Sequence, residues 1–371
     1  MRTLILGAGF GGLEAATRLK RLRPDEDVVL VDERSTFLMG ATKLWVLDGR
    51  RRAGEGERAI ADVARHGVRV VQARAEAVDP AAKRARIGGA DVAYDRLVLA
   101  LGARLAPEEV PGLAQHARNL YAKEGVAALH GDLAALRGGK VLFLVTAMPF
   151  KCPPAPYEAA MLAKSFLERR GVRAEVAIAS PEPQPIPIAG KECGDTIRGW
   201  VEERGVRVLN GKQVAHVEPG RVVFADGSKE AFDLLAAVPP HKPPPLVAQL
   251  FGGWAPADPA TLATPLPDVW AVGDCNAVKL ANGKPLVKAG VMAEGEGRVV
   301  AQRLAGEDAR FDGKGLCYLE LGDGMGTEVA GDFYATPQPI VAAKPPSKAS
   351  LEGKHRFEAE RLERWFGDPQ R

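Results

Sequence analysis

The sequence has 371 residues, which is long enough for two or three domains that each bury a core. Hydrophobic residues make up 46% and charged residues 26%, and the net charge is only +3, so a disordered chain and a nucleic-acid partner are both excluded. The four cysteines are too scattered for a disulfide scaffold, and with the six histidines they show no metal-binding spacing, so we predict no metal site.

The first predicted elements form a βαβ unit. Residues 3–6 are an apolar run, residues 13–22 carry leucines and alanine at helical spacing, and residues 28–31 are a second buried strand. Further strands are predicted at residues 68–71, at 84–87, where the strand is expected to be exposed, and at 94–101, before Gly102.

A glycine turn joins the first strand to the first helix. Its sequence is GAGFGG, and Asp32 follows at the end of the second strand. Glycines at this spacing allow a tight turn, close backbone approach and helix packing, and together they place a pyrophosphate on a helix N-terminus. The acid at the second strand can accept ribose hydroxyls. We therefore predict that a dinucleotide is bound by Gly7, Gly9, Phe10, Gly11, Gly12, Asp32 and Glu33.

A second α/β unit begins near residue 140, but its expected phosphate loop differs. The strand at residues 141–145 is followed by TAMPFKCPPAPYE, in which Cys152 and several prolines occupy the place of a glycine turn. Proline removes a backbone N–H donor and fixes φ, which leaves a poor cradle for a pyrophosphate. The sequence therefore disfavours NADH as electron donor and indicates a thiol site.

The remaining pattern predicts an α/β fold with two Rossmann-like (FAD/NAD(P)-binding) domains, the second inserted into the first. Strands and helices alternate to residue 238, a DG turn at residues 226–227 forms a hairpin, residues 269–274 return to the first sheet, and residues 289–304 form a helix. The predicted boundaries are residues 1–110 with 255–310 for the first domain, 111–254 for the second, and 311–371 for a small C-terminal segment.

The ends of the sequence bear on location. A strand is predicted almost at the first residue, and no apolar run could cross a bilayer, so we expect no signal peptide or transmembrane helix and a cytoplasmic or peripheral protein.

Two features leave alternatives open. The run of arginines at residues 50–52 forms a solvated loop or contacts anionic lipid, and the tail packs on the core or forms an amphipathic membrane helix with Phe357, Leu362, Trp365 and Phe366.

Two later segments resemble the flavoproteins that have two dinucleotide-binding domains. They are residues 94–102, and Gly273-Asp274 after an apolar strand. More specifically, the chain resembles sulfide:quinone oxidoreductases and the flavoprotein subunit of flavocytochrome c sulfide dehydrogenase. The resemblance is carried by FKCPPAPYE around Cys152, by LCY around Cys317, and by VPPH, GWAPAD and PLVKAG.

The resemblance implies a fold with bound FAD and a redox disulfide between Cys152 and Cys317. The alternative for either cysteine is a buried free thiol, and Cys193 and Cys275 are expected to be structural. The family pattern also implies FAD contacts at Gly102, Gly273, Asp274, Lys288, Ala289 and Gly290. Lys288 would stabilise reduced flavin or is a solvated lysine, and Glu158 is either an acid or base at the site or a first-turn carboxylate favoured by the helix dipole. Because residues 37–42 contain no cysteine, the FAD is expected to be non-covalent.

The implied activity is oxidation of hydrosulfide or a related sulfur substrate. Thiolates are effective in such thiol–disulfide exchange, and the product would be sulfane sulfur or polysulfide. A quinone is the implied acceptor. The alternatives are a separate c-type cytochrome, since the chain has no haem-attachment motif, and a flavin-binding protein without turnover. The oligomeric state is left open, with a homo-oligomer among the alternatives.

Overall fold

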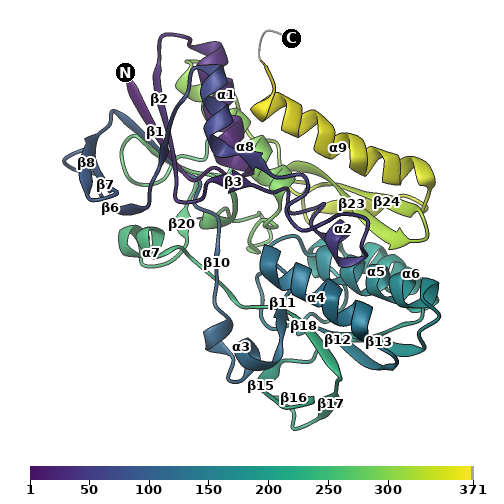
Figure 1. Ribbon diagram of the computed structural model, residues 1–371. Helices are drawn as coiled ribbons and strands as arrows, with labels where there is room; N and C mark the ends of the chain where they lie inside the picture. The colour runs from purple at the N-terminus through teal and green to yellow at the C-terminus, as the bar shows by residue number, and fades with distance from the viewer. Residues whose placement is uncertain (369–371) are drawn as a thin grey trace.

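The first layer is a five-stranded parallel sheet. The computed structural model describes residues 1–368 (Figure 1), and the strand order of this sheet is β21-β9-β1-β2-β5. These strands are β1 (Arg2–Leu6), β2 (Asp27–Asp32), β5 (Arg69–Gln72), β9 (Arg96–Leu99) and β21 (Val269–Ala271). Helix α1 (Phe10–Leu22) connects β1 to β2, so the βαβ opening predicted from the sequence is confirmed.

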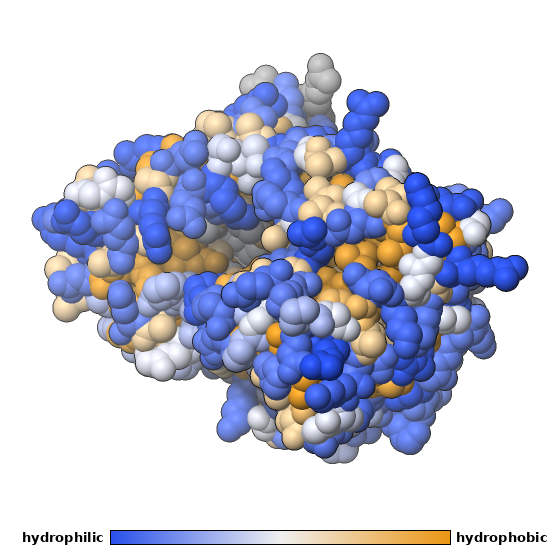
Figure 2. All heavy atoms as spheres, turned by 60° about the horizontal axis from the view of Figure 1, so that its bottom comes forward, coloured by the Kyte–Doolittle hydropathy of each residue, from blue (hydrophilic) through white to orange (hydrophobic). Residues whose placement is uncertain are grey.

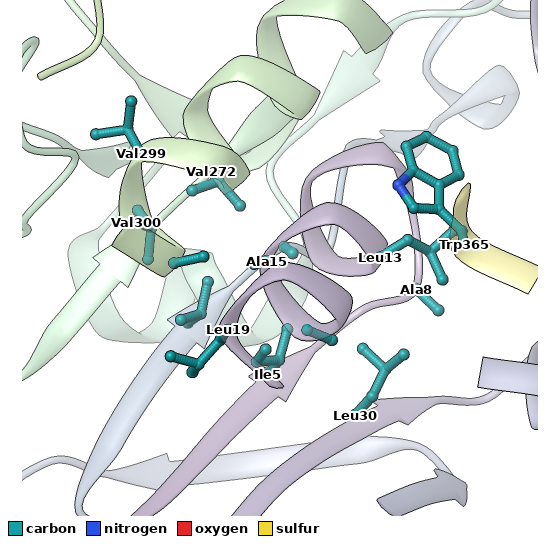
Figure 3. Close-up of a cluster of buried hydrophobic side chains, with 14 of the residues drawn as sticks. Ile5, Ala8, Leu13, Ala15, Leu19, Leu30, Val272, Val299, Val300 and Trp365 are labelled. Atoms are coloured by element: carbon teal, nitrogen blue, oxygen red, sulfur yellow. The ribbon is translucent and has the colours of Figure 1, made fainter. Parts of the chain in front are cut away.

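Successive side chains of the central strand, β1, point alternately to the two faces of the sheet, and both faces are apolar. Ile5 points to one face, where α1 and α8 (Gly290–Leu304) pack, whereas Leu4 and Leu6 point to the other. Figure 3 shows the first face, with Ile5 and Leu30 below Leu13 and Leu19 of α1, and with Val299 and Val300 of α8 nearby. The second face is covered by β6 (Ala75–Asp79), β7 (Arg84–Ile87), β8 (Ala90–Ala93) and α7 (Pro245–Phe251).

The predicted exposure of strand β7 is wrong for one of its two faces. Residues 84–87 were expected to form an exposed strand, but Ala85 and Ile87 are buried against the first sheet while Arg84 and Arg86 face solvent. The strand alternates with a period of two, which is typical of an antiparallel sheet with one face covered.

The second layer is another parallel sheet, with order β11-β18-β12-β13-β14. Its strands are β11 (Arg118–Asn119), β12 (Gly139–Val145), β13 (Ala174–Ala179), β14 (Val206–Leu209) and β18 (Leu234–Val238). One face packs on helices α4 (Lys123–Ala135), α5 (Ala155–Arg169) and α6 (Lys191–Glu203). The other packs on α3 (Leu113–His116) and on the antiparallel strands β15 (Val214–Glu218), β16 (Arg221–Phe224) and β17 (Lys229–Ala231).

The two sheets are joined by segments that cross between them side by side. Strand β10 (Arg104–Leu105) leaves the first sheet and pairs antiparallel with β19 (His241–Lys242), which follows the last strand of the second sheet. Strand β21 then returns beside β9. The fold class predicted from the sequence, with two Rossmann-like units, is therefore confirmed, while the residue boundaries of the domains stay a prediction.

Short elements complete the connections. They are β3 (Thr36–Phe37), β4 (Arg58–Ala59), α2 (Leu44–Leu47), β20 (Ala255–Pro256), β22 (Asn276–Ala277) and the 3-10 helices Ile60–His66, Pro107–Glu109, Pro187–Ala189 and Gly273–Cys275. Across residues 1–368, we find no helix whose length and apolar content would suffice to span a bilayer.

The C-terminal segment packs against both units. It consists of an antiparallel sheet with β23 (Lys314–Gly322), β24 (Met325–Asp332) and β25 (Ile340–Ala343), followed by α9 (Lys348–Phe366). In Figure 1, α9 crosses over this sheet towards the helices of the first unit. The apolar tail residues are buried in the first unit's core, which agrees with the core-packing alternative: Phe357, Leu362, Trp365 and Phe366.

The arginine run at residues 50–52 is not simply a solvated loop. Arg50 pairs with Glu320 of β23 at 2.6 Å, and Arg51 pairs with Glu358 of α9 at 2.5 Å. Both glutamates are buried, so these ion pairs attach the loop after α2 to the C-terminal segment. The loop is thus partly solvated, with Arg50 and Arg52 exposed, whereas Arg51 is partly buried in its ion pair.

The surface of the protein is mostly hydrophilic. In the view of Figure 2, hydrophilic side chains cover most of the surface and hydrophobic ones gather in patches between them. Among the described residues, the large hydrophobic side chains that are exposed are Met1, Leu22, Met148 and Ile340, which come from four different segments. Single exposed apolar side chains of this kind are ordinary at protein surfaces.

Trp365 is the anchor of α9, and its removal should destabilise the fold. The indole is fully buried, meets Phe10 and Phe37 edge-on at centroid distances of 5.4 and 5.8 Å, and donates to Glu14 at 2.9 Å. We expect Trp365→Ala to lower the free energy of unfolding by about 3–5 kcal/mol, measured by urea denaturation. The exposed Arg356→Ala on the same helix is the control, and equal midpoints for the two variants would contradict the anchor.

Candidate active site

A large cavity lies where the carboxyl ends of the first sheet meet the start of α8 and the cysteine-bearing segments. Its volume is about 720 Å³. The predicted site residues that line it come from seven separate segments of the chain, and they are Gly7, Gly9, Phe10, Gly11, Asp32, Glu33, Gly102, Cys152, Gly273, Asp274, Ala289, Gly290 and Cys317. Gly12, Glu158 and Lys288 are not among the lining residues of the described chain.

The glycines of the turn differ in how much space surrounds them. A Cβ atom on Gly12 would lie 1.8 Å from the Gly7 carbonyl oxygen, so this residue is required for packing of the turn. A Cβ on Gly9 would meet nothing within 4 Å, and Gly9 faces the cavity. The turn therefore combines a tightly packed base with open space above it, which fits the close approach of a pyrophosphate.

Asp32 is already engaged by the protein. Its carboxylate accepts from the Ala8 N–H at 2.7 Å and pairs with Arg34 at 2.7 Å. Burial raises the pKa of Asp32, but the bonds from Arg34 and Ala8 outweigh it, so the pKa lies below its ordinary value. Asp32 thus holds the glycine turn in place, while its contact with a ribose stays a prediction. Arg34, which the sequence reasoning missed, also lines the cavity.

Cys152 is held at the cavity by backbone hydrogen bonds. Its N–H donates to the Lys288 carbonyl at 2.7 Å, and its carbonyl accepts from the Ala155 N–H at 2.9 Å and the Tyr121 hydroxyl at 3.1 Å. Its φ is +50°, a left-handed conformation that is uncommon for a residue with a side chain and that often marks a functional position. Burial raises the pKa of the Cys152 thiol to about 11, Glu158 raises it further and Lys354 lowers it.

Cys317 reaches the same cavity from β23, where it is paired with Val329 of β24. Burial raises the pKa of Cys317, and the next largest causes are the Cys152 and Glu158 charges. All four cysteines are free thiols in this structure, so the predicted Cys152–Cys317 disulfide is not formed here and stays a proposal. Cys193 and Cys275 are buried, and the Cys275 thiol donates to backbone carbonyls of Leu99 and Val272.

Lys288 supports the cavity wall. Its ammonium group donates to the carbonyls of Asp274 at 2.7 Å and Asn276 at 2.9 Å, and it lies 3.9 Å from the centre of the Trp254 ring. Burial lowers its pKa, with Asp274 acting in the opposite direction. Lys288 thus orders the loop that carries Asp274, and its carbonyl orders Cys152.

A buried charge network lies behind the two cysteines. Lys354 of α9 pairs with Glu158 of α5 and lies 3.6 Å from Glu320 of β23. Glu320 also accepts from the Trp45 indole at 2.9 Å. Burial raises the pKa of Glu158, although Lys354 opposes it. Because Lys354 also lines the cavity, the network connects the interior to the site.

The sequence reasoning missed several cavity residues besides Arg34. Lys43, Tyr121, Lys151, Tyr318, Lys354 and Phe357 all line the wall near the cysteines. Lys151 and Tyr318 are the sequence neighbours of Cys152 and Cys317, which is a signal that was available. Lys43 and Lys354 have no such signal, because a lone lysine in a loop or helix resembles a solvated one.

Comparison with known proteins agrees with this geometry. The model of the pyridine nucleotide-disulphide oxidoreductase family matches residues 1–297. The chain belongs to this family. It is therefore an oxidoreductase and a flavoprotein, as the sequence predicted.

Individual relatives are more distant. The mitochondrial sulfide:quinone oxidoreductase of Mus musculus is 24% identical over 356 residues, covering 91% of this chain and 79% of the relative. The structure of the Aquifex aeolicus sulfide:quinone oxidoreductase superposes with a TM-score of 0.86 at 19% identity, covering 99% and 92% of the two chains. An NADH dehydrogenase-like protein of Mycobacterium tuberculosis is 29% identical over 247 residues, or 62% of this chain and 60% of that protein.

The two glycines should separate folding from cofactor binding. Gly9→Ala adds a methyl group in the open space of the turn, where φ is −89° and alanine is unstrained, so the variant should fold normally but lose most of its bound flavin. Gly12→Ala should fail to fold stably. The measurements are the ratio of flavin to protein absorbance and the thermal unfolding midpoint of each purified variant. A Gly9→Ala protein with a full flavin complement would contradict this reading of the turn.

Proposed function

We propose that this flavoprotein oxidises sulfide and passes the electrons to a quinone. The observation that carries the proposal is that Cys152 and Cys317, 165 residues apart (317 − 152), line one cavity together with the glycine turn of the dinucleotide site. The similarity to the mouse and Aquifex sulfide:quinone oxidoreductases supports the same substrate class.

The cavity fits a non-covalently held FAD. Gly7, Gly9 and Gly11 would hold its pyrophosphate, with Asp32 or Glu33 at the ribose and Asp274 near the ribityl chain. The loop from Phe37 to Thr42 contains no cysteine that could form a covalent link. When bound, the flavin supplies a two-electron acceptor beside the cysteines.

The two cysteines supply the sulfur chemistry. Hydrosulfide attacks one sulfur of the oxidised Cys152–Cys317 pair, so that one S–S bond breaks, another forms, and the products are a persulfide on one cysteine and a thiolate on the other. Over the full turnover, sulfide sulfur loses two electrons and leaves as sulfane sulfur or polysulfide, and the quinone gains two electrons and two protons. Burial raises the pKa of Cys152, and Lys354 opposes part of that increase, which assists departure of the thiolate.

The corresponding edge of the second sheet is unsuited to NADH. Prolines 153, 154 and 156 stand at the start of α5, where N–H donors would be needed. Glu182 follows β13 and is buried, with its carboxylate accepting from Tyr157 at 2.8 Å and from Ser180 at 2.9 Å. Burial raises the pKa of Glu182 to about 7. Because this carboxylate is buried and already accepts from Tyr157 and Ser180, it is not free to accept a ribose hydroxyl.

An aromatic wall beside Cys317 supports a quinone as acceptor. The rings of Tyr318 and Phe357 meet edge-on at 5.9 Å and both line the cavity. Lys354, one turn before Phe357, presents an ammonium group that can donate a hydrogen bond to a quinone oxygen. Because a lipid-soluble quinone lies in the membrane, the protein would bind at the membrane surface to reduce it.

The cysteines provide the first test. Under anaerobic conditions, sulfide should bleach the visible flavin band of the wild type, whereas NADH should not. We expect Cys152→Ser and Cys317→Ser each to slow bleaching by roughly two orders of magnitude or more, because each removes one half of the disulfide. Cys193→Ser, which changes a buried thiol away from the cavity, is the control. Normal bleaching in both cavity variants would overturn the proposal, and rapid bleaching by NADH would favour the NADH dehydrogenase-like reading.

The acceptor is tested separately. Wild-type turnover with sulfide should proceed with decyl-ubiquinone and not with cytochrome c. We expect Tyr318→Ala to raise the KM for decyl-ubiquinone about tenfold, equivalent to about 1.4 kcal/mol, while leaving sulfide bleaching intact. Tyr334→Ala, a tyrosine packed on Phe311 and not on the cavity wall, is the matched control. Preference for cytochrome c would support the sulfide dehydrogenase alternative, and a bleached flavin that neither acceptor reoxidises would support a flavin protein without turnover.

A further inference from the structure

Two lysines face the cavity beside Cys152, and neither has an acidic partner. Lys43 precedes α2 and Lys151 precedes Cys152 in the chain, yet both ammonium groups lie by the same Tyr121 ring, at 5.6 and 5.9 Å from its centre. Lys43 also donates to the Tyr121 carbonyl at 2.7 Å. Within residues 1–368 neither lysine forms an ion pair.

This arrangement is electrostatically unfavourable without a further partner. Burial lowers the pKa of Lys43 to about 7, the Lys151 charge lowers it further, and the charges of Cys152 and Glu124 act in the opposite direction. The neighbouring His241 adds no cation, because burial followed by Lys151 lowers its pKa to about 3. The other cavity lysine, Lys354, differs in that two carboxylates face it.

An anion between the two lysines would remove this repulsion. An ammonium group has three donors, and Lys43 uses one of them on the Tyr121 carbonyl, so donors remain for a ligand. Cations that line a partly enclosed cavity raise the local concentration of small anions and their association rates by about 10–10³-fold. An anion held here would lie in the cavity that Cys152 also lines, close enough to the thiol for its charge to interact with Lys43.

We propose that Lys43 and Lys151 form a binding site for a small sulfur-bearing anion and deliver it to the sulfur of Cys152. The identity of that anion as hydrosulfide rests on the proposed function, but the site itself does not. The lysines are binding residues for the anion, and their charge is what they contribute.

The test compares an anionic with a neutral thiol reagent. In flavin-loaded protein carrying Cys317→Ser, so that Cys152 is the reactive cavity thiol, the rates of alkylation of Cys152 by iodoacetate and by iodoacetamide are measured by peptide mass spectrometry. The ratio of the two rates cancels the thiolate fraction of Cys152. Relative to the same ratio for free cysteine, we expect iodoacetate to be favoured roughly tenfold or more.

The double variant Lys43→Met and Lys151→Met should bring this ratio down to that of free cysteine, with the iodoacetamide rate retained. Lys83→Met, an exposed lysine paired with Asp268 outside the cavity, should leave the ratio unchanged. A ratio in the parent protein that equals the free-cysteine value would overturn the proposal. An elevated ratio that survives in the double variant would also overturn the proposal. If that variant has in addition lost its flavin, the lysines serve to bind the cofactor.

A second measurement keeps the two proposals distinguishable. In protein with both cavity cysteines, the double lysine variant should raise the sulfide concentration for half-maximal bleaching about tenfold or more. An elevated alkylation ratio in a protein that sulfide never bleaches would retain the anion site and reject sulfide oxidation. Sulfide bleaching of a protein that shows no preference for iodoacetate would retain sulfide oxidation and reject the anion site.

Discussion

One backbone hydrogen bond joins the two halves of the site. The N–H of Cys152, from the loop that follows the second sheet's central strand, donates at 2.7 Å to the carbonyl of Lys288, just before α8 of the first unit. The side chain of Lys288 is itself fixed on the carbonyls of Asp274 and Asn276. The position of Cys152 relative to the dinucleotide turn therefore depends on a chain of contacts that crosses from one unit to the other.

The C-terminal segment completes this geometry through buried charge. Helix α9 is anchored by Trp365 in the first unit's core, while Lys354 on the same helix reaches Glu158 of the second unit. Removing one member of such a buried pair leaves an uncompensated charge, which is far more costly than the pair is stabilising. The network thus fixes β23, and with it Cys317, against α5. Lysines in this cavity consequently have two different roles: Lys354 is neutralised by protein carboxylates, whereas Lys43 and Lys151 are left for a ligand.

Much of the fold was predictable because its signals are local. The GAGFGG turn, the buried runs at β1, β2 and β12, and the proline-rich replacement of the second turn each depend on neighbouring residues, and the structure has all of them. The burial of one face of β7 and the ion pairs of Arg50 and Arg51 depend on segments distant in sequence, so the local pattern did not predict them. Lys43 and Lys354 were missed for the same reason: nothing near either residue shows that it faces a cavity. The shared cavity of Cys152 and Cys317 was expected only from a family resemblance.

Whether these two cysteines act as a redox pair can be measured directly by peptide mapping of the oxidised protein. The flavin-loaded protein would be oxidised, its remaining thiols alkylated, and the protein digested without reductant. We predict a linked peptide that contains Cys152 and Cys317, two hydrogen masses lighter than the sum of its parts, with Cys193 and Cys275 unlinked. Recovery of Cys152 and Cys317 as separately alkylated peptides, or of either one joined to a different cysteine, would contradict the central claim.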